Sequence, residues 1–145
     1  MEKSERKIVL VLVFLTIIMG ALVAFFCVKA DSCRKDYDDA LKKAKDFVVA
    51  RYEPGVETDR IQVLGGSLGY DYKITSSEGE VLKDVYIDDS EFKEYVNAAI
   101  RAEDEEFRVA VFASLFLFVG AIFALLLISY FIESVLDKVK KILYS

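Results

Sequence analysis

Histidine and tryptophan are absent from this 145-residue sequence, and proline occurs once. Without an imidazole, the chain lacks the usual general base of a serine nucleophile and the commonest protein ligand for zinc, copper or haem. Its two cysteines, Cys27 and Cys33, are too few to build a structural zinc site within one chain. The sequence therefore predicts a protein that is not an enzyme and that has no cofactor and no metal site.

Charge is absent from two long stretches, residues 8–28 and 109–132, which contain 21 and 24 residues. As helices they would be about 31 and 36 Å long, enough to cross a hydrocarbon core of about 30 Å. Inside lipid, backbone N–H and C=O groups must pair within their own segment, and a helix achieves this. We therefore expect an integral membrane protein with two transmembrane helices in contact with membrane lipids.

Each stretch has an alternative interpretation. The first follows the basic residues Lys3, Arg6 and Lys7, as a cleaved signal peptide would, but it exceeds the apolar run of about 7 to 15 residues that is typical of such peptides. The second resembles a buried core helix, which a domain of this size could not surround. We therefore expect a retained anchor at residues 8–28 and a second one at residues 109–132.

Orientation follows from the segments outside these stretches. Residues 1–7 and 133–145 together carry six Lys or Arg against four Asp or Glu, whereas residues 29–108 carry 13 against 20. Loops longer than about 60 residues cross membranes largely regardless of their charge. We therefore expect a multi-pass protein of the cell membrane with both termini cytoplasmic and residues 29–108 extracytoplasmic.

The middle segment changes its hydrophobic period along the chain. Over residues 37–52 apolar side chains recur every three or four positions, which predicts an amphipathic helix that starts after Asp31 and stops at Pro54. A period of two follows near residues 61–63, 70–74 and 81–87, which predicts three antiparallel strands. The order of one helix and a three-stranded sheet resembles small PepSY or cystatin-like modules over about fifty residues, without a shared motif.

A second amphipathic helix is expected after the sheet. Asp88 and Glu91 have the spacing of a capping box, and residues 90–119 contain neither glycine nor proline. This helix is therefore expected to continue into the second transmembrane helix. The predicted fold class is a membrane protein with two transmembrane helices flanking a small α+β domain at residues 29–108, followed by an amphipathic cytoplasmic tail at residues 133–145.

Small residues share one face of each uncharged stretch when about 3.6 residues form a turn. Such residues let helices approach closely and associate within lipid, although they are also common in membrane helices without a packing role. The predicted helix-packing interface comprises Thr16, Gly20, Ala24, Cys27, Ala113, Gly120 and Ala124.

Residues 65–69 match G-x-S-x-G, the turn that exposes the nucleophile of some hydrolases. The chain offers Ser67 no histidine, and a strand rather than a helix is expected next, so a flexible glycine turn is favoured over a Ser67–Lys73 pair. Acidic clusters near residues 36–39, 88–91 and 103–106 lack the spacing of a calcium loop and are interpreted as helix caps and solvated faces.

Two further patterns keep two interpretations each. In an extracytoplasmic domain, Cys33 is expected to be a free thiol or to pair with Cys33 of another copy. The apolar face of residues 132–143 is expected either to lie on an anionic leaflet or partner helix, or simply to continue the second helix. Neither pattern defines a ligand.

No ionisable residue lies in either uncharged stretch, which argues against transport by a single copy. The net charge of −5 gives no basis for binding nucleic acid. We expect a non-enzymatic accessory or structural subunit of a larger membrane assembly, whose acidic domain contacts a protein partner or ligand. The alternative is a homo-oligomeric channel or sensor with two helices per subunit, gated by the domain.

Overall fold

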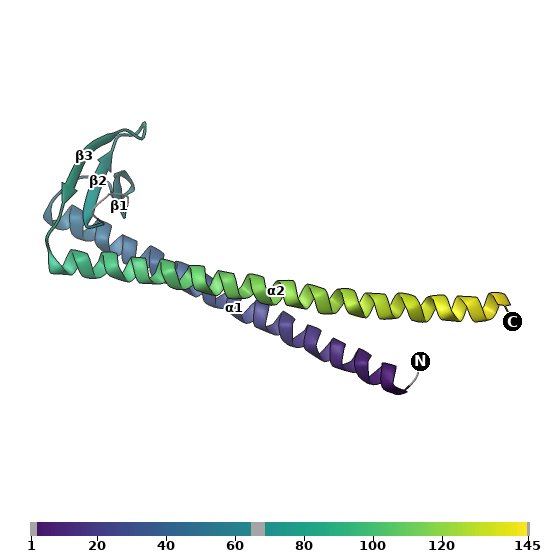
Figure 1. The fold of residues 1–145 in the computed structure, drawn as a ribbon. Coiled ribbons are helices and arrows are strands. Elements are labelled where there is room, and N and C mark those ends of the chain that lie inside the picture. The colour runs from purple at the N-terminus through teal and green to yellow at the C-terminus, as the bar shows by residue number, and fades with distance from the viewer. Residues whose placement is uncertain (1–2, 65–68, 145) are drawn as a thin grey trace. The chain divides into compact units, whose positions relative to one another are not determined.

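The computed structural model describes residues 3–64 and 69–144 (Figure 1). Two long apolar helices flank a three-stranded antiparallel sheet, as the sequence predicts. The elements in chain order are α1 (Lys3–Arg51), the short 3-10 helix η1 (Thr58–Arg60), β1 (Ile61–Val63), β2 (Asp71–Thr75), β3 (Val81–Tyr86) and α2 (Ser90–Tyr144).

The chain divides into two compact units, which we describe separately. The helical unit contains residues 1–29 and 108–145, and the α+β unit contains residues 30–107. Both long helices therefore contribute to each unit. The helical unit holds the two uncharged stretches, whereas the sheet belongs to the α+β unit.

Helix α1 does not begin at the expected capping residue Asp31, because it already runs from Lys3. Residues 21–53 contain neither glycine nor proline, so nothing interrupts the helix near Asp31. No new helix start therefore forms there for Asp31 to cap. The predicted stop is confirmed: the amides of Tyr52 and Glu53 both donate to the carbonyl oxygen of Val48, at 2.8 and 2.9 Å, before Pro54.

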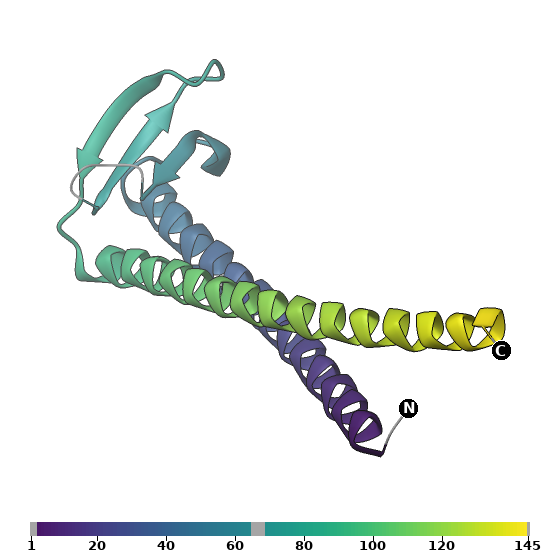
Figure 2. The same cartoon turned by 45° about the vertical axis from the view of Figure 1, so that its right-hand side comes forward.

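The sheet has the order β1-β2-β3, and both pairs of neighbours are antiparallel (Figure 2). In its register Ile61 lies opposite Ile74, while Tyr72 lies opposite Val85. A tight hairpin joins β2 to β3, with a hydrogen bond of 2.8 Å from the Ser76 amide to the Glu80 carbonyl oxygen. Gly79 in this turn has a φ of +89°, which side chains other than glycine rarely adopt.

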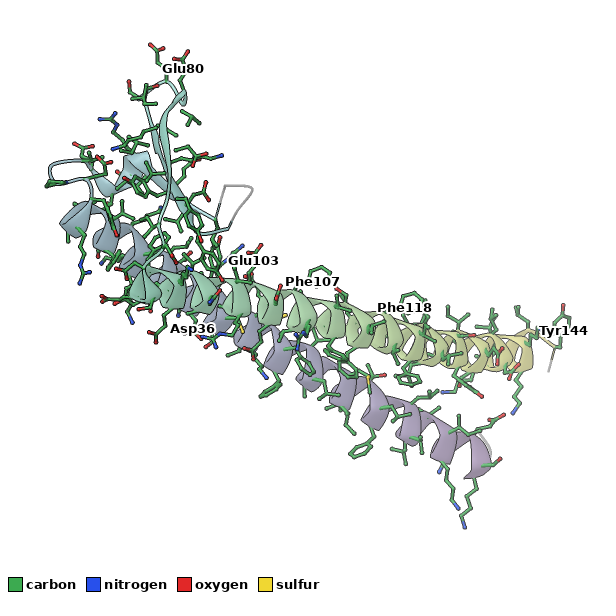
Figure 3. All side chains as sticks on the ribbon, turned by 60° about the vertical axis from the view of Figure 1, so that its left-hand side comes forward. Asp36, Glu80, Glu103, Phe107, Phe118 and Tyr144 are labelled. Carbon is green, nitrogen blue, oxygen red and sulfur yellow. The ribbon has the colours of Figure 1, made fainter. Side chains whose placement is uncertain are left out.

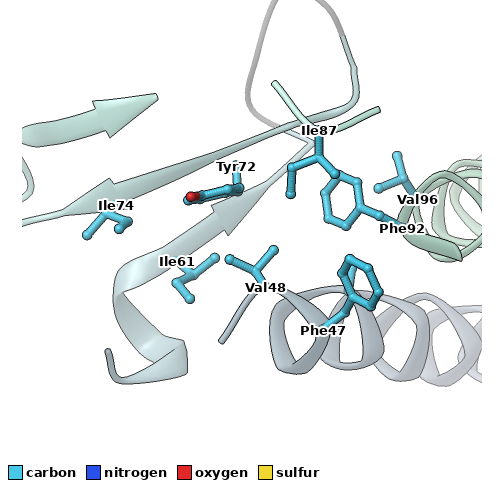
Figure 4. Packing of buried hydrophobic residues seen from close by; sticks show 9 residues of the cluster. Phe47, Val48, Ile61, Tyr72, Ile74, Ile87, Phe92 and Val96 are labelled. Atoms are coloured by element: carbon cyan, nitrogen blue, oxygen red, sulfur yellow. The ribbon is translucent and has the colours of Figure 1, made fainter. Parts of the chain in front are cut away.

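The core of the α+β unit lies between one face of the sheet and segments of both helices (Figure 4). Phe47 of α1 stacks on Phe92 of α2 with ring centroids 6.0 Å apart. Strand β2 contributes Tyr72 from the opposite layer. The buried cluster consists of Ala44, Phe47, Val48, Ile61, Tyr72, Ile74, Ile87, Phe92 and Val96.

Glu53 ties the end of α1 to two strands. Its Oε1 accepts a hydrogen bond of 2.7 Å from the Tyr72 hydroxyl and also bonds the Lys83 ammonium. The Lys83 hydrogen bond, followed by that from Tyr72, lowers the pKa of Glu53. Burial, and then the bond to Glu53, raises the pKa of Tyr72, so its hydroxyl stays a donor at physiological pH.

The start of α2 departs from the predicted capping box. Oδ1 of Asp89 accepts hydrogen bonds from the amides of Glu91, at 2.9 Å, and Phe92, at 3.5 Å. The neighbouring Asp88 instead pairs with the Lys93 ammonium. Asp89 is therefore the cap, because the helix begins one residue later than the sequence spacing suggested.

Replacing Phe92 should unfold the α+β unit far more readily than replacing a phenylalanine on the surface of the same helix. Phe92 is 0% exposed, whereas Phe107 is 71% exposed. Phe92→Ala should cost about 3–5 kcal/mol of stability, and Phe107→Ala less than about 0.5 kcal/mol. Thermal unfolding followed by tyrosine fluorescence measures both; similar losses would mean that the core does not lie where we place it.

Candidate functional site

Within the helical unit, a seam of buried or partly buried residues runs along each helix. The residues that define it recur at alternating spacings of three and four, which is the repeat of a coiled-coil contact. Leu15, Ile18 and Leu22 on α1 and Ala124 on α2 are also partly buried beside it. On α1 the seam contains Val9, Leu12, Thr16, Met19, Val23 and Phe26. On α2 it contains Val109, Ala113, Phe116, Gly120, Phe123, Leu127, Tyr130 and Ser134.

Two contacts show how closely the seams meet. A Cβ atom added to Gly120 would lie 3.1 Å from the Cβ of Met19, so only glycine fits there without a shift. The Phe26 ring stacks on Phe116 and Phe112, with centroid distances of 5.5 and 6.0 Å. A small residue and stacked aromatic rings therefore define this helix–helix contact.

The residues of the predicted packing interface fall into two groups. Thr16, Ala113, Gly120 and Ala124 are partly buried within the helical unit, and the Thr16 hydroxyl donates to the Leu12 carbonyl oxygen at 2.7 Å.

The remaining three predicted residues, Gly20, Ala24 and Cys27, are exposed. A Cβ on Gly20 would have no described atom within 4 Å. Gly20 and Ala24 on α1 therefore do not pack against Gly120 and Ala124 on α2, and the stripe of small residues on α1 is exposed.

The seam was missed because nearly every position of the uncharged stretches is apolar, which leaves little contrast between buried and exposed faces. One signal was available in the sequence: Phe116, Phe123 and Tyr130 recur every seven residues. In such segments the positions of large side chains, rather than the pattern of hydrophobicity, show the repeat of the helix contact.

Large apolar side chains cover the outside of the helical unit (Figure 3). Phe118 and Tyr144, labelled in that figure, are both exposed on α2. Other examples are Leu10, Phe14, Ile17, Phe25 and Val28 on α1 and Leu117, Leu125, Ile128 and Phe131 on α2. A water-soluble protein rarely presents so large a continuous apolar surface.

On the sheet face opposite the core, β2 carries Asp71 and Lys73, because side chains alternate between faces and Tyr72 points into the core. Asp71 is only 5% exposed, and its Oδ1 has no hydrogen-bond partner within the described part of the chain. Lys73 lies opposite Asp84 of β3 in the register. The three residues form the acidic sheet cluster.

Burial is the main cause that raises the pKa of Asp71, followed by a hydrogen bond and repulsion from the Asp84 carboxyl group. The positive charge of Lys73 acts in the opposite direction and is weaker. A hydrogen bond between two carboxyl groups requires one of them to hold a proton. Sequence reasoning passed over Asp71 because charge on a strand usually marks a solvated face.

Several other charged groups of the α+β unit have partners within the unit. The Arg51 guanidinium lies 5.0 Å from the centre of the Phe47 ring and pairs with Asp89 and Glu91, at 3.4 and 3.6 Å. Such exposed ion pairs each contribute about 0–1 kcal/mol. Glu106 of the last acidic cluster pairs with Arg34 at 3.7 Å.

The acidic side chains and the cysteines of residues 3–64 and 69–144 bear on metal and thiol chemistry. Across these residues, no three acidic, histidine or cysteine side chains gather in a way that could hold a metal ion. Cys33 is buried in the α+β unit, so pairing with another copy would require it to become accessible. The predicted glycine turn with Ser67 lies outside the described residues, apart from Gly69.

No protein-family model matches the chain, and no curated protein or solved structure matches it.

The stability of the α+β unit should fall as pH rises from the ordinary carboxyl range through the raised pKa of Asp71. In that window the folded state holds a proton that the unfolded state has already released. Asp71→Asn should flatten this dependence and, at pH values above the raised pKa of Asp71, raise stability by about 1–3 kcal/mol, because no buried charge remains.

Thermal melts at a series of pH values measure this effect. Asp59→Asn, which replaces an exposed aspartate, is the matched control and should leave the slope as it is. An unchanged slope in Asp71→Asn would show that the Asp71 carboxyl group does not hold the extra proton.

Proposed function

We propose that this chain is a two-pass membrane protein that acts as a non-enzymatic accessory subunit, with the α+β unit presented to a protein partner. The observation that carries the proposal is the apolar surface of the helical unit. Both helices contain a segment long and apolar enough to cross a bilayer, and nearly all the side chains of those segments are exposed or only partly buried. Lipid is the surrounding that such a surface requires.

The proposed topology places both termini in the cytoplasm and the α+β unit outside. The basic residues near the termini, Lys3, Arg6 and Lys7 together with Lys138, Lys140 and Lys141, support this orientation. The strongly acidic character of residues 29–108 is compatible with export, since acidic residues oppose it little.

Strand β3 is the surface through which the α+β unit would contact its partner. It is a six-residue strand at the edge of the sheet, so one side of its backbone has no neighbouring strand among the described residues. It also exposes the apolar side chains of Val81, Leu82 and Tyr86. An edge with free backbone groups and apolar side chains suits the addition of a strand from a partner.

Topology can be tested with a single cysteine at the exposed hairpin tip. In a chain with Cys27 and Cys33 replaced by alanine, Ser77→Cys should react with a membrane-impermeant maleimide on sealed cells. Ser4→Cys, the control at the other proposed side, should react only after permeabilisation. The reverse pattern would invert the topology, and release of the chain by alkaline carbonate would refute membrane insertion.

Self-association is the second candidate, and the open stripe of Gly20, Ala24 and Cys27 favours it. Because Gly20 has no described neighbour within 4 Å, a helix from another copy could approach α1 there. This arrangement underlies the alternative function of a homo-oligomeric sensor or channel. It leaves the seam between α1 and α2 intact.

Mass measurement after mild-detergent purification separates the two candidates. An accessory subunit should purify with a different protein, and Leu82→Glu on the β3 edge should release that protein. A homo-oligomer should instead dissociate in Gly20→Leu, with a loss of at least about tenfold in association.

Gly120→Leu is the contrast for Gly20→Leu, because its side chain would collide with Met19 of the same chain. It should disturb the helix pair of each monomer rather than the contact between copies. Both candidates would be contradicted if the chain purified as a monomer without a partner and none of the three substitutions changed this result.

A further inference from the structure

Two adjoining cavities lie between α1 and α2 within the helical unit. The first has a volume of about 530 Å³ and is lined mainly by apolar side chains, namely Val9, Val13, Leu127, Ile128 and Phe131. The second has a volume of about 410 Å³ and is lined mainly by charged side chains. Tyr130, Ser134 and Lys138 line both, so the two cavities share one wall.

The polarity of this double cavity changes in one direction along the helices. On α1, Val13 and Val9 belong to the apolar cavity, while Glu5 belongs to the charged one. On α2 the change runs from Leu127 to Lys141, a rise of about 21 Å. The apolar side chains of the first cavity lie within the uncharged stretches and the charged side chains of the second lie outside them, which is the order of the acyl and head regions of a lipid leaflet.

The charged cavity carries both signs in equal number. Its lining contains three lysines and three carboxylates, so its formal charge is zero. The lysines are Lys138, Lys140 and Lys141, and the carboxylates are Glu5, Glu133 and Asp137. This composition matches a head group that itself carries one anion and one cation, and it gives a purely anionic head group no advantage.

The kind of cation can also be inferred. A primary ammonium has three N–H donors that carboxylates can accept, whereas a quaternary ammonium has none. Hydrogen bonds between charged groups are the stronger kind, so they discriminate between these two head groups. The volumes of both cavities lie in the range of about 300–1,000 Å³ that is usual for ligand sites.

We propose that the double cavity binds one phospholipid with an ethanolamine head group. An acyl chain occupies the apolar cavity, the lysines hold the phosphate, and the carboxylates accept hydrogen bonds from the ammonium. The proposal rests on the membrane insertion argued above. It assigns a specific lipid to the cytoplasmic ends of the helix pair, where the lipid fills the space that side chains of this chain leave between the helices.

Native mass spectrometry of the full chain in mild detergent tests this assignment. The probes are phosphatidylethanolamine, phosphatidylcholine and phosphatidylglycerol with identical acyl chains. We expect a single bound phosphatidylethanolamine, retained about tenfold more than either other lipid. Equal retention of the three lipids, or preference for phosphatidylglycerol, would overturn the proposal, as would a cavity filled by a second copy in a lipid-free dimer.

Two sets of variants locate the site. Val13→Trp should fill the apolar cavity and abolish retention, whereas Leu10→Trp, at a position that is 68% exposed on the same helix, should not. Glu133→Gln combined with Asp137→Asn should remove the preference for ethanolamine over choline without lowering the retention of phosphatidylcholine. Retention unchanged in Val13→Trp, or a preference unchanged in the carboxylate variant, would contradict the site.

Failure of this proposal is distinct from failure of membrane insertion. A chain that resists carbonate extraction but shows no lipid preference contradicts the lipid site alone. A chain that carbonate releases contradicts the premise, and the lipid site with it.

Discussion

The pairing of α1 with α2 is the interaction on which each unit of the molecule depends. In the α+β unit, three short strands would not be stable alone, and Phe47 and Phe92 from the two helices supply the surface that the sheet covers. In the helical unit, Met19 and Gly120 bring the same two helices close together, although the helices there are apolar on their outer faces as well. Different physical forces therefore hold one pair of helices together: burial from water in the α+β unit, and shape complementarity in the helical unit.

The parts of the fold that depend on local periodicity could be predicted from the sequence. The strands followed from their period of two, and the end of α1 followed from Pro54 and Gly55. Features that depend on contacts between distant residues were not predictable in this way. The seam through Met19 and Gly120 differs too little in polarity from the apolar residues around it to be recognised in the sequence, and the burial of Asp71 depends on contacts with residues outside its own strand. The shift of the cap from Asp88 to Asp89 shows that spacing alone does not resolve a single residue.

The two units have different kinds of surface. The helical unit presents apolar side chains around a packed seam. The α+β unit keeps its polar groups largely satisfied, with Glu53 and Arg51 as examples, while the β3 edge has open backbone positions. Asp71 is the exception, because a buried carboxyl group beside a second one is costly unless a proton is shared. Asp71 lies on the sheet face away from the core, so the free-energy cost of burying its carboxyl group does not disturb the packing of Tyr72 on the other face.

The order of the elements also governs how the molecule is made. Phe47 and Val48 leave the ribosome well before Phe92 and Val96, since all three strands lie between them in the chain. The hairpin of β2 and β3 can form early, because its contacts are local. The face that carries Tyr72, however, is covered only in part, by α1, until the first turns of α2 have been synthesised. Translation must therefore proceed into α2 before this small domain can complete the burial of its aromatic residues.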